Sequence, residues 1–395
     1  MRFNTEGSFN LRNFQSFILG FSVFLFVYPS FAWEFVSVVT TLAASLLLLA
    51  MLIELIHQGL RLSSFVPLIL FVSYNVYTAV VGVSINTDLL TTPVLATLLF
   101  FTFSKKTIYY SYFSFVRIFG YILVLSIGFY LLKLIRLYSP ELELVTSADG
   151  REYYVYPFNA MSAITVGNSL YLSTGFYRFH GFMGEPGWIG TISGLVLFSL
   201  KFQFSRFKIL YIYLTAALLS MSLGGYFPIF IGFVYFYFGR KLLYAIVPLS
   251  ALVIFNMELF DRFILSRIAV EDGQLSGDNR TSAVFDSEWT RFINTPDVIW
   301  GKGQSQHTVF GEGVSSWKTL VYNGGVIGFF LYLSIFVAIF FTLVKSGNKK
   351  FAFIFFLVFL MTIYHRPRIQ YVYFLIILYG GLLYNEMKYS KILNK

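Results

Sequence analysis

The chain has 395 residues, of which 57% are hydrophobic, 21% aromatic and only 12% charged. A soluble globular domain carries about 25% charged residues, so this composition excludes that class and indicates a polytopic membrane protein. The absence of cysteine excludes disulfides, thiolate catalysis and cysteine-ligated metals. The net charge of +10 has to be assigned to the two sides of a membrane before it indicates any partner.

Apolar runs long enough to cross about 30 Å of hydrocarbon predict about twelve transmembrane helices. The first run also fits a signal peptide ending near Ala32, although the spans that follow it favour an anchor. We therefore expect residues 1–395 to form one all-α integral membrane domain. The predicted spans are 14–33, 35–56, 64–84, 88–104, 107–135, 187–204, 208–223, 226–239, 242–258, 319–343, 350–364 and 369–385.

The positive-inside rule is satisfied if both termini are cytoplasmic. The loops then assigned to the cytoplasm hold many lysines and few acids, whereas the outer segments hold slightly more acids than cations. The basic balance thus reflects orientation in the membrane, and no nucleic-acid partner is implied. Two extracytoplasmic segments, 136–186 and 259–318, are too long to be simple connections, so we expect them to carry function.

The first outer segment ends in a charged, glycine-rich stretch, residues 177–190, that runs directly into an apolar span. It contains Arg178, His180 and Glu185, and such side chains at the mouth of a membrane helix indicate a functional site. Pro186 suits the first turn of the helix that follows. An ordinary interfacial loop before a helix is an equally good interpretation of this stretch taken alone.

The outer segments favour arginine where the inner loops favour lysine. A guanidinium group can grip phosphate oxygens through two hydrogen bonds, so the outer arginines point to a phosphate or carboxylate ligand. Many of them would still be ordinary surface ion pairs. Arg366 and Arg368 resist that explanation because they lie in a short turn, His365-Arg366-Pro367-Arg368, between two apolar spans. A phosphate-binding role is favoured there over an interfacial anchor.

The second outer segment supplies a further pair, Arg280 and Arg291. If residues 280–293 are helical, these arginines lie about three turns apart on one face and could clamp a diphosphate. A plain amphipathic helix on the bilayer surface is nearly as good an interpretation. The chain has no P-loop, G-x-S-x-G or H-E-x-x-H motif, so nucleotide chemistry and zinc hydrolysis have no support.

With these motifs in view, the chain resembles the O-antigen polymerase and O-antigen ligase superfamily of bacterial envelopes, whose fold is of the C-type glycosyltransferase kind. The resemblance covers residues 160–330 closely and the rest only in hydropathy. Each motif is loose, and their order carries the specificity. The motifs are Arg178-x-x-Gly181-x-x-x-Glu185-Pro186, Ser220-Met-Ser-Leu-Gly224-Gly225, Arg280…Trp289…Pro296…Gly301-Lys-Gly303, and Gly325-Val-Ile-Gly328.

The resemblance implies a multi-pass enzyme of the bacterial inner membrane with its active site facing the periplasm. It would transfer a growing glycan from undecaprenyl diphosphate to a sugar hydroxyl of a new lipid-linked repeat unit. Its partners would be those repeat units, the lipid bilayer and a membrane protein that regulates chain length. Arginines would stabilise the departing diphosphate. We assign that role to Arg178, Arg280, Arg291, Arg366 and Arg368.

The attacking hydroxyl needs a base, for which Glu185, His180 and His307 are the candidates. Arginine can replace a metal ion at a diphosphate, so neither a cofactor nor a metal is expected. The ligases place a His-Asn pair where this chain has Val314-Ser315-Ser316-Trp317, which favours a polymerase, although His307 lies near enough to keep a ligase open. A flippase or carrier of lipid-linked oligosaccharide also suits twelve spans, but such carriers usually have symmetric halves, which this chain lacks.

Overall fold

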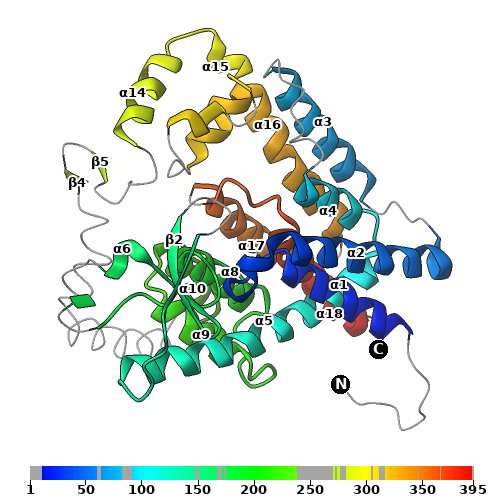
Figure 1. The fold of residues 1–395 in the computed structure, drawn as a ribbon. Coiled ribbons are helices and arrows are strands. Elements are labelled where there is room, and N and C mark those ends of the chain that lie inside the picture. Colours follow the sequence, from blue (N-terminus) through cyan, green and yellow to red (C-terminus); the bar gives the residue numbers. More distant parts are fainter. Residues whose placement is uncertain are drawn as a thin grey trace, which may run out of the picture.

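The fold is mostly helical, with long apolar helices, as a membrane-embedded protein requires (Figure 1). The computed structural model describes residues 11–59, 64–81, 91–146, 151–166, 171–172, 175–237, 270–271, 274–275, 282–303, 306–310, 316–345, 347–364 and 366–393. The helices of the first half are α1 (Leu11–Leu25), α2 (Val36–Gln58), α3 (Phe65–Val81), α4 (Thr92–Phe100), α5 (Lys105–Leu134) and α6 (Ala163–Val166). Those of the second half are α8 (Pro186–Ser199), α9 (Leu210–Leu219), α10 (Leu223–Tyr237), α14 (Ala283–Phe292), α15 (Asp297–Trp300), α16 (Trp317–Leu343), α17 (Lys349–Met361) and α18 (Val372–Leu393). Short 3-10 helices are η1 (Ser30–Phe35), η4 (Gln306–Phe310) and η5 (Thr362–Tyr364).

Every predicted span within the described residues contains a helix, whereas 242–258 lies outside them. Three described helical stretches are long and apolar enough to cross a membrane alone, namely Ser30–His57, Lys105–Leu134 and Trp317–Leu343. Helices α4, α8, α9 and α17 are shorter than the predicted spans, whereas α10 and α18 are longer. The first predicted span, 14–33, ends as a helix at Leu25 and continues through a turn into η1.

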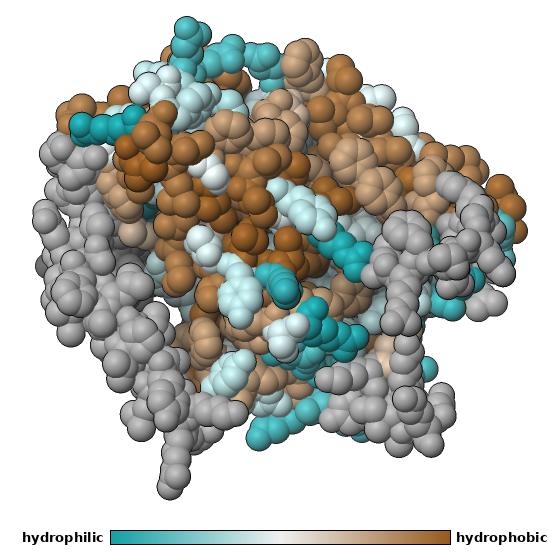
Figure 2. Space-filling model, turned by 90° about the horizontal axis from the view of Figure 1, so that it is seen from below, coloured by the Kyte–Doolittle hydropathy of each residue, from teal (hydrophilic) through white to brown (hydrophobic). Residues whose placement is uncertain are grey.

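Large apolar side chains are exposed along the long helices. On α2, Leu48, Leu52 and Ile56 are 50%, 55% and 79% exposed. Figure 2 shows apolar residues over much of the face that it presents. Exposing so much apolar surface to water would cost free energy, so these surfaces are suited to contact with lipid.

The first outer segment departs from the all-α expectation, since it contains an antiparallel sheet with the order β1-β2-β3. The strands are β1 (Glu143–Thr146), β2 (Glu152–Tyr156) and β3 (Asn159–Ser162), and Tyr153 pairs with Val145 and Ser162. The tyrosines and the valine of β2 are residue types that favour strands, and Tyr153 and Tyr156 are buried. A second pair, β4 (Val270–Glu271) and β5 (Gln274–Leu275), lies in the other outer segment.

The core forms where α8 is surrounded by its neighbours. Nearly all of α8 is buried, and it packs against α9, α10 and α18 (Figure 1). Helix α1 packs on α2 and α5, while α3 packs on α16. Gly380 lets α18 approach α5 closely, because a Cβ there would lie 2.0 Å from the Tyr112 ring. This packing fixes the N-terminal end of α8, which the charged stretch 177–190 enters.

Candidate functional site

The stretch before α8 is held by backbone hydrogen bonds to three distant elements. Phe179 N donates to Leu219 O at the end of α9, and Gly181 O accepts from Ala160 N of β3. Phe182 O accepts from Ser30 N of η1. Gly181 adopts φ 56°, a left-handed conformation that favours glycine. The stretch is therefore a fixed part of the fold rather than a simple connection.

Glu185 lies between two arginines that come from separate parts of the chain. Its Oε1 accepts from Arg151 Nη1 at 2.6 Å, and its Oε2 lies 3.3 Å from Arg366 Nη1. Arg151 precedes β2, and Arg366 lies in the turn between α17 and α18. Glu185 is the N-cap residue of α8, yet its side chain makes no capping hydrogen bond. The carboxylate forms ion pairs with the two arginines instead.

Arg366 is buried although it is charged, with only 3% of its side chain exposed. Its guanidinium carbon lies 4.6 Å from the centre of the Trp188 ring, a cation–π contact. Gly187 makes room for it, because a Cβ there would lie 2.1 Å from Arg366 Nη2. Burial lowers the pKa of Arg366, and the nearby Glu185 carboxylate opposes that shift. The cation is thus held at the N-terminal end of α8, where the helix dipole also favours an anion.

Arg178 has a structural partner that the sequence did not indicate. Its Nε donates to Ser220 O at 3.0 Å and its Nη2 donates to Met221 O at 2.9 Å. These carbonyls follow the end of α9, and Met221 adopts φ 45°. Arg178 therefore holds the turn between α9 and α10 as well as carrying positive charge next to His180.

The first two sequence motifs meet through glycines on α8 and α10. A Cβ on Gly225 would lie 2.6 Å from the backbone of Gly190, and one on Gly190 would lie 2.6 Å from Ser220 Oγ. The two helices approach closely because neither has a side chain at the contact. The close approach places Arg178, Glu185 and the α9–α10 turn together.

The third and fourth motifs meet in a similar way. Helix α16 is broken at Gly325, which has φ 64° and ψ −173°. Gly301 fits against this break, since its Cβ would lie 2.4 Å from Asn323 O. Lys302 N donates to Tyr322 O and Gly303 N to Asn323 O, both at 2.8 Å. The segment 301–303 is thereby fixed to the first turns of α16.

His180 is 5% exposed and makes a 3.0 Å hydrogen bond from Nδ1 to Gly184 O. A carbonyl only accepts, so Nδ1 carries the proton of the neutral ring and Nε2 remains an acceptor. Burial lowers the pKa of His180 to about 4, and the Arg178 cation lowers it further. The ring is therefore neutral near pH 7, as a base must be.

His307 lies on η4 against Asn323, at the break in α16. Asn323 Oδ1 is 3.3 Å from the His307 backbone N, and Asn323 Nδ2 is 2.9 Å from His307 Nδ1. Asn323 Oδ1 also lies 3.2 Å from Nδ1, so Nδ1 contacts both ends of the amide and the geometry fits either neutral tautomer of His307. Burial lowers the pKa of His307 to about 4. Both histidines are therefore buried and neutral near pH 7.

Of the remaining predicted residues, Arg368 lies near the charged cluster, whereas Arg291 is exposed on α14. Arg368 is exposed and close enough to act electrostatically on His307 and Tyr373, as Arg366 does on Tyr373. The side chain of Arg291 is 81% exposed on α14, with Glu288 3.7 Å away. Helix α14 begins at Ala283, so the predicted helix 280–293 is shorter than expected at its start. Arg280 and His365 lie outside the described residues.

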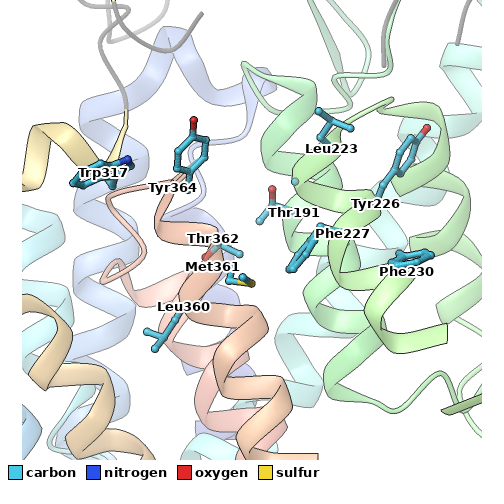
Figure 3. A pocket seen from close by; sticks show the side chains of 11 residues that line it. Thr191, Leu223, Tyr226, Phe227, Phe230, Trp317, Leu360, Met361, Thr362 and Tyr364 are labelled. Atoms are coloured by element: carbon cyan, nitrogen blue, oxygen red, sulfur yellow. The ribbon is translucent and has the colours of Figure 1, made fainter. Parts of the chain in front are cut away.

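An apolar cavity of about 760 Å³ lies next to this charged cluster. Figure 3 shows Thr191, Tyr226 and Phe227 on one wall and Leu360 and Met361 on the facing wall. Trp317 and Tyr364 lie at its upper end in this view.

Hydrogen bonds connect residues of both cavity walls to Arg366 or to its neighbour Gly187. Thr191 donates to Gly187 O at 2.7 Å, one turn along α8, and Arg366 N donates to Thr362 O at 2.6 Å. The site thus combines a buried cation with an adjoining apolar space. Sequence reasoning did not select Arg151 or Asn323; Arg151 directly precedes a strand that was not predicted, and Asn323 lies within an apolar span.

Among the described residues, no group of three or more His, Asp or Glu side chains could hold a metal ion. No protein-family model, curated protein or solved structure matches the chain. What the site can do is therefore inferred from its own residues and geometry.

Proposed function

We propose that the protein is a membrane glycosyltransferase that polymerises a surface glycan on a polyprenyl diphosphate carrier. The apolar cavity of about 760 Å³ beside the buried Arg366 carries this proposal. A polyprenyl diphosphate is an anionic headgroup on a long apolar chain, and it needs these two environments side by side. Arg366, with Arg178 and Arg368 nearby, would stabilise the charge that accumulates on the departing diphosphate.

The neutral histidines suit the proton transfers of this reaction. His180 Nε2 is an acceptor that could take the proton of an attacking sugar hydroxyl. His307 lies close enough to Arg368 to be affected by its charge, and this position suits contact with the diphosphate rather than deprotonation of the acceptor. Glu185 is paired with two arginines, so His180 is the preferred base among the three candidates.

The test is deletion of the gene followed by gel analysis of the envelope glycans. A polymerase loss leaves single repeat units attached to the acceptor, and the wild-type chain restores the ladder. Long chains retained on the lipid carrier would instead identify a ligase, and loss of both products a flippase. In the restored strain, Arg366→Met should fail to restore the ladder, whereas the exposed outer Arg136→Met should restore it.

A further inference from the structure

Glu185 is an anion held between two cations from separate parts of the chain. Its two oxygens face Arg151 and Arg366, which belong to elements that meet only in the folded protein. A carboxylate that caps its own helix would accept from backbone N–H groups of the first turn. The Glu185 side chain makes no such bond and is directed to the guanidinium groups.

The exposure of the three side chains is graded from the interior to the surface. Arg366 is 3% exposed, whereas Glu185 and Arg151 are 34% and 35% exposed. An anion from the solvent can therefore reach Arg151 and Glu185 without a change in the fold. The inner cation would remain costly to bury if it had no anion beside it.

The charges within the group do not balance. Glu185 is one carboxylate in contact with two guanidinium groups, so cations outnumber anions among these three side chains. A diphosphate carries more negative charge and more acceptor oxygens than a carboxylate, and arginine binds phosphate oxygens in pairs. The N-terminal end of α8 adds a favourable dipole for the same ligand.

We propose that Glu185 is a resident internal anion that the substrate diphosphate displaces, and that Arg151 is a further diphosphate-binding residue. The inference rests on the proposed function, since it takes a polyprenyl diphosphate as the ligand. On binding, the diphosphate takes over Arg366 and Arg151, and the Glu185 carboxylate moves into the solvent-exposed region. No bond is formed or broken in this exchange.

The test measures binding of farnesyl diphosphate to the full chain in detergent. Glu185→Gln removes the competing anion, so its Kd should be about tenfold lower than that of the wild type, whereas binding of uncharged farnesol should not change. Arg151→Gln should raise the Kd for farnesyl diphosphate about tenfold. Substitution of the exposed Arg136 in Arg136→Gln should not alter it. Equal or weaker binding by Glu185→Gln would overturn the displacement.

Three further outcomes keep the inference separate from the proposed function. If Glu185→Gln does not fold, Arg151→Gln decides, because unchanged binding there would exclude Arg151 as a ligand and overturn the inference. If the wild type and both variants bind as expected but deletion leaves envelope glycans intact, the polymerase proposal fails while anion exchange stands. A glycan defect with no tightening in Glu185→Gln would overturn the inference alone.

Discussion

Arg366 combines three features that differ from those of an ordinary surface cation. It is buried, it lies over Trp188, and its counter-anion is partly exposed. A planar guanidinium can make the ring contact and the carboxylate contact together, which a lysine ammonium cannot do equally well. Arg366 is thus suited to bind an anion at a fixed position beside the N-terminal end of α8.

The substitution Arg366→Met tests whether the Arg366 cation supports the fold or binds the ligand. Methionine fills similar space without a buried charge, and Glu185 keeps Arg151, so stability should change by less than about 1 kcal/mol. Farnesyl diphosphate binding should fall at least about tenfold. Thermal unfolding and a binding titration measure the two effects. A large loss of stability with unchanged binding would show that Arg366 only supports the fold.

The low pKa values of His180 and His307 predict acid sensitivity. Both pKa values fall from the ordinary 6.5 to about 4, so the unfolded chain binds protons in this window that the folded chain does not. Stability is therefore greatest above pH 6.5 and falls as the pH drops toward 4, by up to about 3 kcal/mol per histidine.

Unfolding temperatures at about pH 7.5 and about pH 5 measure this effect. The double variant His180→Gln/His307→Gln should lose less stability on acidification than the wild type. His57→Gln is the matched control, because His57 is exposed at the end of α2. An unchanged pH dependence in the double variant would contradict the burial of the two rings as its cause.

At the residue scale, sequence reasoning found the charged positions but not their partners. Glu185 and Arg366 were both selected because charge is rare beside apolar spans, and the structure brings them together. Arg178 was expected to face a ligand, yet two of its N–H groups donate to backbone carbonyls. No local pattern reveals such bonds, because the acceptors lie more than forty residues away.

The contact between α8 and α10 depends on glycine at the element scale. Gly190→Ala would bring a Cβ 2.6 Å from Ser220 Oγ and 2.7 Å from Ser222 Cβ, which should cost about 1–3 kcal/mol of stability. The displaced turn would also disturb the carbonyls that hold Arg178. Thermal unfolding and farnesyl diphosphate binding should both decline.

Gly128→Ala provides the matched control for this prediction. Gly128 lies within α5, and a Cβ there would meet nothing within 4 Å. Alanine is favoured over glycine in a helix by about 1 kcal/mol, so stability should stay equal or rise. If both alanine variants behaved alike, helix propensity rather than close packing would explain the result at Gly190.

Elements were predictable wherever a long apolar run dominates. The helix α5, at Lys105–Leu134, lies close to the expected span 107–135. The strands β1–β3 were missed, because Tyr153, Tyr154 and Tyr156 suit an interfacial loop as well as a strand. The break at Gly325 was also missed, since hydropathy does not register a single left-handed residue.

At the scale of the whole molecule, the cavity lies between elements distant in sequence. One wall comes from α8 and α10, and the other comes from α17 and η5 (Figure 3). The buried cation contacts both walls, since Arg366 follows η5 while lying against Gly187 of α8. Ligand binding there would therefore link the two helix groups.

The orientation of the molecule stays a prediction that the cysteine-free chain makes easy to test. Ser287→Cys on α14 and Ser205→Cys between α8 and α9 each introduce one exposed thiol into a chain that has none. The positive-inside rule assigns Ser287 to the outside and Ser205 to the cytoplasm. A membrane-impermeant maleimide should label Ser287→Cys in intact spheroplasts and Ser205→Cys only after permeabilisation. The reverse pattern would place Arg366 and Glu185 on the cytoplasmic side, where a periplasmic polymerase cannot work.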